Sequence, residues 1–147
     1  MGLFQSFDIS ASGMTAERFR TDIIAENVAN VNTTRTEDGT PYTRKAVIFS
    51  EKTQSNFADV LQGAIRGYEG NGVKVSKVYE DTETDYIMEY DPSHPDADEN
   101  GYVTYPNVNI VTEMTNLIDA SRAYEANVTA FNTSKAIASA GLNIGNQ

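Results

Sequence analysis

Residues 107–140 read NVNIVTEMTNLIDASRAYEANVTAFNTSKAIASA and contain no proline and no glycine. Apolar residues recur in this stretch at steps of four and three, interrupted by Ser121 and Lys135: Ile110, Met114, Leu117, Tyr124, Val128, Phe131 and Ala138. The spacing predicts one helix with an apolar seam, roughly 50 Å long at about 1.5 Å per residue. A repeat near 3.5 residues favours a second helix lying nearly parallel to the first.

The residues around this stretch predict where the helix begins and ends. Pro106 cannot continue a helix backwards, and Asn107 or Asn109 can cap the first amides. Gly141 suits the C-terminal end. An ordinary core helix is one interpretation, but the many alanines make the seam thin, which favours close contact between helices.

Composition narrows the possible functions. The 147 residues suffice for one domain, and the hydrophobic fraction of 39% predicts a small core. Cysteine is absent, which excludes disulfides, thiolate metal sites and cysteine nucleophiles. The N-terminus has no basic region and no continuous apolar run, so we expect neither a cleaved signal peptide nor direct membrane insertion.

The net charge of −10 is concentrated in one segment. Residues 80–100 contain nine acids and no Lys or Arg, whereas the other residues contain twelve acids and eleven bases. Most of the chain is therefore nearly neutral, and it lacks the basic face that nucleic-acid binding requires. A solvated loop is the simplest interpretation of the acidic run.

A second helix is predicted near the N-terminus, at residues 14–31. Its seam contains Phe19, Ile23 and Val28, while Gly13 and the small polar residues before it lower helix propensity in the first dozen residues. The simplest arrangement is that the two thin seams, which lie at opposite ends of the chain, pack against each other. The assembly seam we predict consists of Phe19, Ile23, Val28, Met114, Leu117, Tyr124, Val128 and Phe131.

Between the helices the sequence predicts a small β insert. A turn at residues 33–41 precedes strands at 42–50 and 73–79, and shorter strands follow at 86–90 and 102–105. Residues 57–72 are predicted to be a glycine-rich connection with one helical turn. The predicted fold is α+β, mainly α: residues 1–33 and 107–147 form a helical coiled-coil domain, and residues 34–106 form the β-rich insert with its acidic loop.

Two local patterns could carry chemistry. Asp96, Asp98 and Asn100 match the start of an EF-hand calcium loop, but position twelve falls on Asn107, and the prolines before the loop exclude the usual entering helix. A tight acidic turn explains the pattern better than a calcium-dependent module. The single histidine, His94, provides neither a zinc site nor a triad by itself, and no phosphate- or dinucleotide-binding motif is present. We therefore expect no enzyme activity, metal or cofactor.

Residues 27–33, NVANVNT, resemble a known family signature. The matching residues are Asn27, Ala29, Asn30, Asn32 and Thr33, which resemble the N-A-N-x-N-T type of signature that ends the N-terminal helix of bacterial flagellar axial proteins. The blocks at 32–36, 90–103, 106–109 and 121–127 resemble the proximal-rod member in particular. No Pro-Gly-Tyr follows residue 32, unlike the distal rod and hook pattern, so a distal rod or hook-junction protein is the runner-up.

The resemblance implies a structural subunit of the flagellar basal body. Such subunits pair their terminal helices as a coiled coil and assemble with one another into a hollow shaft that transmits torque. They are exported unfolded by the flagellar type III apparatus without a cleaved signal peptide. Thin seams bury little area in one chain, so we expect the helices to become ordered only with neighbouring subunits. The asparagines of the motif are expected to end the first helix through side-chain to backbone hydrogen bonds.

Overall fold

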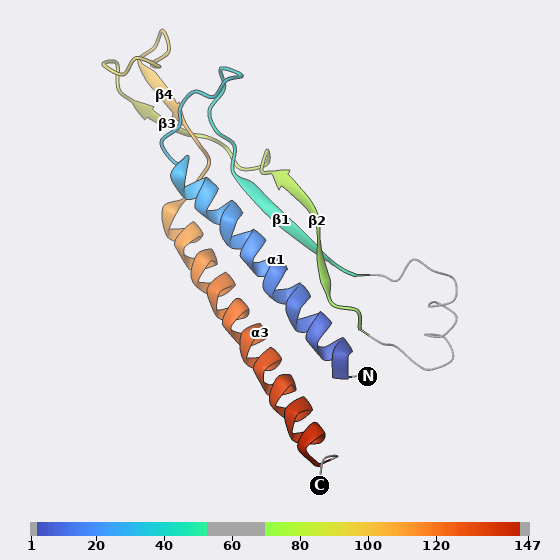
Figure 1. Cartoon of the computed structure of the whole chain (residues 1–147). Coiled ribbons are helices and arrows are strands. Elements are labelled where there is room, and N and C mark those ends of the chain that lie inside the picture. The colour runs from blue at the N-terminus through green and yellow to red at the C-terminus, as the bar shows by residue number, and fades with distance from the viewer. Residues whose placement is uncertain (1–2, 53–69, 145–147) are drawn as a thin grey trace, which may run out of the picture. The chain divides into compact units, whose positions relative to one another are not determined.

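The structure is a computed structural model that describes residues 3–52 and 70–144 (Figure 1). In the described residues two long helices flank four strands along the sequence, which confirms the predicted α+β class. The elements are α1 (Leu3–Ala29), β1 (Lys45–Glu51), β2 (Val73–Glu80), β3 (Ile87–Tyr90), β4 (Tyr102–Tyr105) and α3 (Ile110–Ile144). No helix within the described ranges is both long and apolar enough to cross a membrane.

The four predicted strands are confirmed, and they form two separate two-stranded sheets, β1–β2 and β3–β4. β3 and β4 are antiparallel, with Tyr90 opposite Tyr102 and Met88 opposite Thr104. Backbone hydrogen bonds from Lys52 to Gly72 and from Asp81 to Arg44 lie at the two ends of the β1–β2 sheet, which is therefore antiparallel too. The predicted connection after β1 lies mostly outside the described residues.

The predicted start of the first helix, at residue 14, was wrong, because α1 begins at Leu3. The small residues that lower helix propensity are used for packing instead. Ser10, Gly13 and Ala16 are buried on one face of α1, and the Ser12 hydroxyl donates to the Ile9 carbonyl (2.7 Å). Tertiary contact here outweighs a weak intrinsic preference.

The C-terminal helix was predicted well in its middle and less well at its ends. Asn109 caps α3, since its Oδ1 accepts the amides of Val111 (2.9 Å) and Thr112 (3.2 Å). The helix does not stop at Gly141 but continues to Ile144. Gly141 has φ outside the left-handed region, so the conformation that makes glycine a helix terminator is not adopted there.

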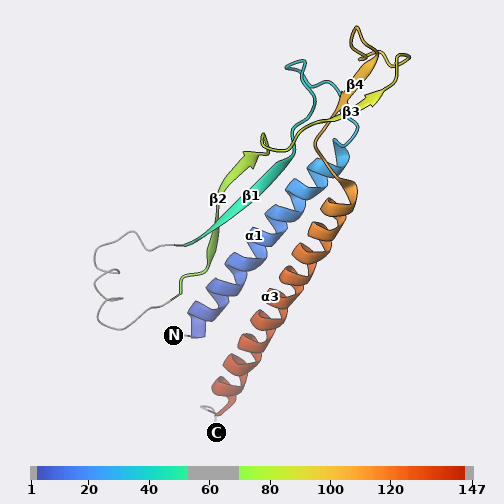
Figure 2. The ribbon, with the colours of Figure 1, turned by 180° about the vertical axis from the view of Figure 1, so that it is seen from behind.

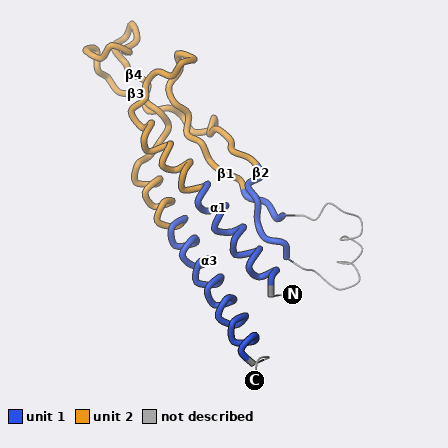
Figure 3. The backbone as a smooth tube through the Cα atoms, viewed as in Figure 1, with its two compact units in different colours: residues 1–19, 49–76, 120–147 blue, residues 20–48, 77–119 orange. Residues whose placement is uncertain are grey.

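The chain divides into two compact units, each containing parts of both helices and of the strands (Figure 3). Unit 1 comprises residues 1–19, 49–76 and 120–147, and unit 2 comprises residues 20–48 and 77–119. In unit 2, the buried apolar side chains are Ile24, Tyr42, Val103 and Val108. The apolar core is therefore small, as the composition predicted.

In unit 1 the segments of α1 and α3 lie side by side and antiparallel (Figure 2). Phe7 packs edge-on against Phe131, with ring centroids 5.0 Å apart. One to two turns further along α1, Gly13 lies so close to Asn127 that a Cβ at residue 13 would be 2.6 Å from Asn127 Oδ1. From the first contact to the second, the residue number rises along α1 and falls along α3, so the two segments run antiparallel. The glycine at position 13 permits their close approach.

Gly13→Ala is expected to lower the free energy of unfolding by about 1–2 kcal/mol, because the new methyl group overlaps the Asn127 amide. Asn127 cannot simply swing away without breaking the bond from its Nδ2 to the Ala123 carbonyl (2.9 Å). Combining Gly13→Ala with Asn127→Ala should recover most of this loss in a double-mutant cycle measured by urea unfolding. Additive effects of the two changes would contradict the contact.

The start of α1 also contacts the segment before β2 within unit 1. Ser12 Oγ accepts the amide of Val73 (3.0 Å), and Gln5 Nε2 donates to the Gly70 carbonyl (3.2 Å). Gly72 has φ +88° and lies against Ser12, so both its conformation and its contact require a residue without a side chain. These contacts connect the N-terminal turns of the helix to the β insert.

Candidate functional site

The predicted seam residues are distributed over both units, and none of them is fully buried. Phe19, Tyr124, Val128 and Phe131 belong to unit 1, whereas Ile23, Val28, Met114 and Leu117 belong to unit 2. Phe19, Met114 and Tyr124 are exposed in the single chain, and the other five are half-buried. Of these eight, Phe131 has a defined aromatic partner, the ring of Phe7.

A hydrogen-bonded polar site of unit 2 is centred on Asn27, which is completely buried. Its Nδ2 donates to the Lys45 carbonyl (2.8 Å) and to Glu113 Oε2 (3.0 Å). Its Oδ1 accepts the Lys45 amide (2.9 Å) and the Tyr42 hydroxyl (2.9 Å). All four hydrogen-bonding positions of the amide are thus used, and they join the end of α1 to β1 and to the start of α3.

Glu113 is the charged member of this polar junction, by which we mean Asn27, Tyr42, Arg44, Asn107 and Glu113. Its side chain is 1% exposed, and its Oε1 accepts Arg44 Nε (2.8 Å) and pairs with Arg44 Nη2 (2.8 Å). Arg44 also lies 3.6 Å from Asp81. Glu113 stands in the first turn of α3, where the helix dipole favours a negative charge. Both carboxylate oxygens of Glu113 therefore have partners: Oε1 pairs with Arg44, and Oε2 accepts the Asn27 amide.

Asn107 completes the junction from the segment before α3. Its Oδ1 accepts the Arg44 amide (2.8 Å), and its Nδ2 donates to the carbonyls of Asp81 (2.6 Å) and Thr84 (3.1 Å). The sequence offered Asn107 and Asn109 as alternative helix caps. The structure assigns the cap to Asn109 and leaves Asn107 to hold β1 and the segment after β2.

The other motif residues lie at the end of α1. Asn30 Nδ2 donates to the Glu26 carbonyl (2.9 Å), and Asn30 Oδ1 accepts the Thr33 hydroxyl (3.1 Å). The Thr33 carbonyl accepts the amide of Tyr42 (3.1 Å), which brings the chain back towards the junction. Ala29 and Asn32 are exposed. Asn30 and Thr33 therefore shape the exit from the helix, while the Asn27 side chain reaches across to other elements.

Burial raises the pKa of Tyr42 from 10.0 to about 12, and the negative charges of Glu26, Glu113 and Glu80 add to this. The folded state thus holds the phenolic proton more tightly than the unfolded state. The stability from this group is complete below pH 10 and is lost as the pH rises towards 12.

The stability advantage of the parent chain over Tyr42→Phe is therefore expected to be about 1 kcal/mol at pH 8, from the hydrogen bond to Asn27, and to decrease above pH 10. Urea unfolding of both chains between pH 8 and pH 12 measures this difference. Other groups that titrate in this range are common to both chains and cancel. A stability advantage that stays constant up to pH 12 would show that folding does not raise the pKa of Tyr42.

The acidic turn uses its carboxylates as hydrogen-bond acceptors. Asp98 Oδ1 accepts the amides of Asn100 and Tyr102, both at 2.8 Å, and these bonds lower the pKa of Asp98. Asp96 accepts the Thr34 hydroxyl (2.8 Å) and lies 3.8 Å from Arg35. Within residues 3–52 and 70–144, no three His, Cys, Asp or Glu side chains are grouped as a metal site. The hydrogen bonds of Asp96 and Asp98 are those of a tight turn whose carboxylates accept backbone amides and a hydroxyl group.

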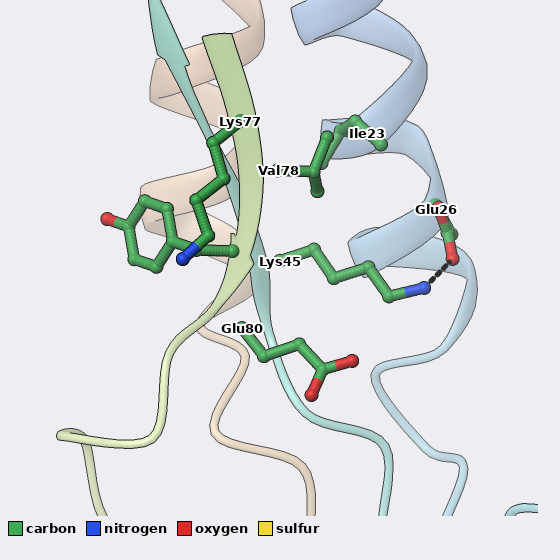
Figure 4. Close-up of a pocket in the computed structure, with 7 residues that line it drawn as sticks. Ile23, Glu26, Lys45, Lys77, Val78 and Glu80 are labelled. Carbon is green, nitrogen blue, oxygen red and sulfur yellow. Dashed lines mark hydrogen bonds and ion pairs between the residues drawn. The ribbon is translucent and has the colours of Figure 1, made fainter.

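A groove of about 420 Å³ lies beside the end of α1 in unit 2 (Figure 4). Ile23 and Val78 face each other across it, and Lys45 Nζ reaches Glu26 Oε1 at 2.7 Å. Lys77, Tyr79 and Glu80 of β2 complete its lining. Its charged groups are of both signs, with Lys45 and Lys77 beside Glu26 and Glu80.

Comparison with known proteins matches each end of the chain to a family model of flagellar basal-body rod proteins. Residues 7–35 match the family model described as flagella basal body rod protein, and residues 99–144 match that described as flagellar basal body rod FlgEFG protein C-terminal. The chain is 43% identical to the flagellar basal-body rod protein FlgC of Borreliella burgdorferi, over 98% of each chain. It is 44% identical to FlgC of Bacillus subtilis and 41% identical to FlgC of Escherichia coli, over 99% of each chain. The chain belongs to the FlgC family.

Membership of the FlgC family confirms the resemblance seen in residues 27–33 and gives the polar junction a context. Asn27 lies in the N-terminal segment that matches, and Asn107 and Glu113 lie in the C-terminal one. Tyr42 and Arg44 lie outside both segments, and they connect them through hydrogen bonds. The junction therefore joins the two rod-protein segments of this FlgC-family chain.

Sequence reasoning missed three members of the junction: Tyr42, Arg44 and Glu113. The sequence did not single out Glu113, and Tyr42 and Arg44 were expected only as residues of the strand at 42–50. A signal was present, because a carboxylate on the predicted inner side of a helix needs a cation. The sequence could not show which of its eleven Lys and Arg residues that cation would be.

Proposed function

We propose that this FlgC-family chain is a non-enzymatic structural subunit of the proximal rod of the bacterial flagellum. It assembles with copies of itself and with other rod proteins into a hollow shaft that passes torque outwards. Identity above 40% to three rod proteins over nearly their full length supports this role. One structural observation makes it physically specific: the first turns of α3 carry, on one face, three apolar side chains that are more than half exposed in the described chain.

That face is formed by Val111, Met114 and Ile118, which we call the outer stripe. The three residues are spaced by three and four positions, so they share one side of the helix. They are 74%, 55% and 52% exposed, whereas Glu113 and Ala120, on the opposite side, are buried. An apolar stripe that the chain itself leaves in water is expected to be covered by a neighbouring subunit.

The helical parts of the chain, residues 1–33 and 107–147, form the assembling domain in this proposal, and residues 34–106 form an insert that they carry. The seam residues of α1 and α3 contribute to a coiled-coil-like contact that neighbouring subunits extend. The antiparallel contact of Phe7 with Phe131, and that of Gly13 with Asn127, support such pairing in unit 1. The half-exposed state of the seam leaves room for neighbours to complete it.

Assembly also completes the ordering of α3. From residue 121 to residue 143 no side chain is fully buried, and six are half-buried. A helix with so little burial gains little from its own chain and opens easily. The polar junction, by contrast, is dense in buried hydrogen bonds, so unit 2 is ordered before assembly and the second half of α3 becomes stable in the rod.

The location follows from the same role. The chain would reach the rod, in the periplasmic part of the basal body, through the flagellar type III export apparatus and without cleavage of a signal peptide. A core as small as that of unit 2 is compatible with passage in an unfolded state.

Replacing Val111 and Ile118 together by serine tests the outer stripe. We expect the double variant to keep the stability of the isolated chain within about 0.5 kcal/mol, because both side chains are exposed. Its amount in purified basal bodies should fall by at least about tenfold, since apolar contacts at an interface centre are lost. Thr112→Ser with Thr115→Ser, on the same turns of the helix, is the matched control. Normal incorporation of the double variant would refute the assignment of this face.

A further inference from the structure

The outward face of the β3–β4 sheet carries a second exposed apolar surface. Met88, Tyr90 and Tyr102 share this face, because Tyr90 pairs with Tyr102 and Met88 stands two residues from Tyr90. Their exposed fractions are 64%, 64% and 42%, while Val103, on the other face of the sheet, is completely buried. We call these three exposed residues the β3–β4 patch.

The patch is held in one arrangement before any partner arrives. The rings of Tyr90 and Tyr102 pack edge to face, with centroids 5.3 Å apart. The Tyr90 ring also lies over Gly101, which has φ +83° and where a Cβ would be 3.0 Å from Tyr90 Cε2. Tyrosine and methionine are typical of interface centres, and rings fixed beforehand lose little entropy on binding.

The surroundings of the patch are acidic. The segment of residues 80–100 that includes β3 has nine acids and no base. Two cations of unit 2 pair with acids of this segment, Arg44 with Asp81 and Arg35 with Asp96. Asp91 directly follows Tyr90, the Asp98 carboxylate accepts the Tyr102 amide (2.8 Å), and Glu99 next to Asp98 is exposed. The patch is thus an apolar centre within a negatively charged rim.

We propose that the β3–β4 patch docks a different protein, whose contact surface has an apolar centre and a rim rich in Lys and Arg. Charge complementarity selects this partner. The residues of this chain outside 80–100 carry twelve acids against eleven bases, so a second copy offers no net positive charge to this rim. Nucleic acids and anionic lipids would be repelled by the acidic rim. The proposal rests on the proposed function, since it assigns one neighbour contact of a basal-body subunit.

The test places a photo-crosslinking residue in the patch of the full chain in living cells, as Tyr90→p-benzoylphenylalanine and separately as Met88→p-benzoylphenylalanine. Basal bodies are purified after irradiation, and the crosslinked peptides are identified by mass spectrometry. The same crosslinkers are combined with Glu99→Lys, which reverses the charge of an exposed rim residue. The matched control is Glu37→Lys, which reverses one exposed acid outside residues 80–100 and outside the assembling helices.

We expect a product with another protein, joined at an apolar residue flanked by Lys or Arg. Reversing this rim charge should lower the yield at least about threefold, and the control should leave it unchanged. A rim-reversed chain that is exported but missing from basal bodies, while the control chain is incorporated, supports the proposal equally.

Three results would overturn the proposal: a product with a second copy of this chain, no protein product, or a yield that rim reversal does not alter. Each of them leaves the rod assignment intact as long as the chain is found in basal bodies. Absence of the unmodified chain from basal bodies would instead contradict the proposed function itself.

Discussion

Glu113→Ala is expected to lower the free energy of unfolding by about 3 kcal/mol, because it removes one partner of a buried ion pair. Arg44 would keep only the longer contact with Asp81 (3.6 Å), and Asn27 Nδ2 would lose one of its two acceptors. This expected loss of stability is at the lower end of the range for broken buried ion pairs, because the Arg44 side chain is 23% exposed and water can reach it. Urea unfolding followed by circular dichroism measures the change.

Glu125→Ala is the matched control for this experiment. Glu125 lies on the same helix but is exposed, and its removal should alter stability by no more than about 0.5 kcal/mol. Equal effects of the two substitutions would mean that the junction does not hold the chain together. Glu113→Gln should lie between them, because it keeps the shape and loses the charge.

Phe131→Asp is expected to abolish incorporation into the rod while export continues. Phe131 packs on the Phe7 ring, and a carboxylate placed there would be desolvated without a cation when neighbouring helices close over it. Export of an unfolded chain does not depend on this contact. The two quantities to measure are the amount of chain in purified basal bodies and the amount exported, and only the first should fall.

Two further variants separate charge from shape in this experiment. Phe131→Leu keeps an apolar side chain and should retain most of the incorporation, whereas Asn132→Asp adds the same charge at an exposed neighbouring position. Rods of normal composition containing Phe131→Asp would refute the role of the seam. Loss of incorporation in Asn132→Asp as well would mean that charge anywhere on this turn is excluded.

The order and type of the elements could be predicted because each has a local signal. Residues 102–105 carry β-branched and aromatic side chains between a glycine and a proline, and β4 occupies these positions. The N-A-N-x-N-T type of signature at Asn27 and Asn30 identified the family from the sequence alone. Local chemistry decides such features, so a single sequence is sufficient.

What the sequence could not show depends on contacts between distant residues. Gly13 lowers helix propensity, and the sequence does not show why a glycine stands at this position. The reason is its close contact with Asn127. Glu113 and Arg44 are 69 residues apart, and nothing in the local pattern of either one indicates the other. The apolar period of α3 located the helix but did not separate the side facing α1 from the outer stripe. Both sides carry apolar residues, and in our proposal a neighbouring subunit covers the outer stripe.

Hydrogen exchange of backbone amides, compared between the isolated chain and purified basal bodies, tests the central claim most directly. In the isolated chain we expect slow exchange in residues 24–29 and 113–120, around the polar junction, and fast exchange in residues 132–143. In basal bodies residues 132–143 should become protected as well. If these residues exchange as slowly in the isolated chain as the junction does, neighbouring subunits are not needed to complete α3, and the account is contradicted.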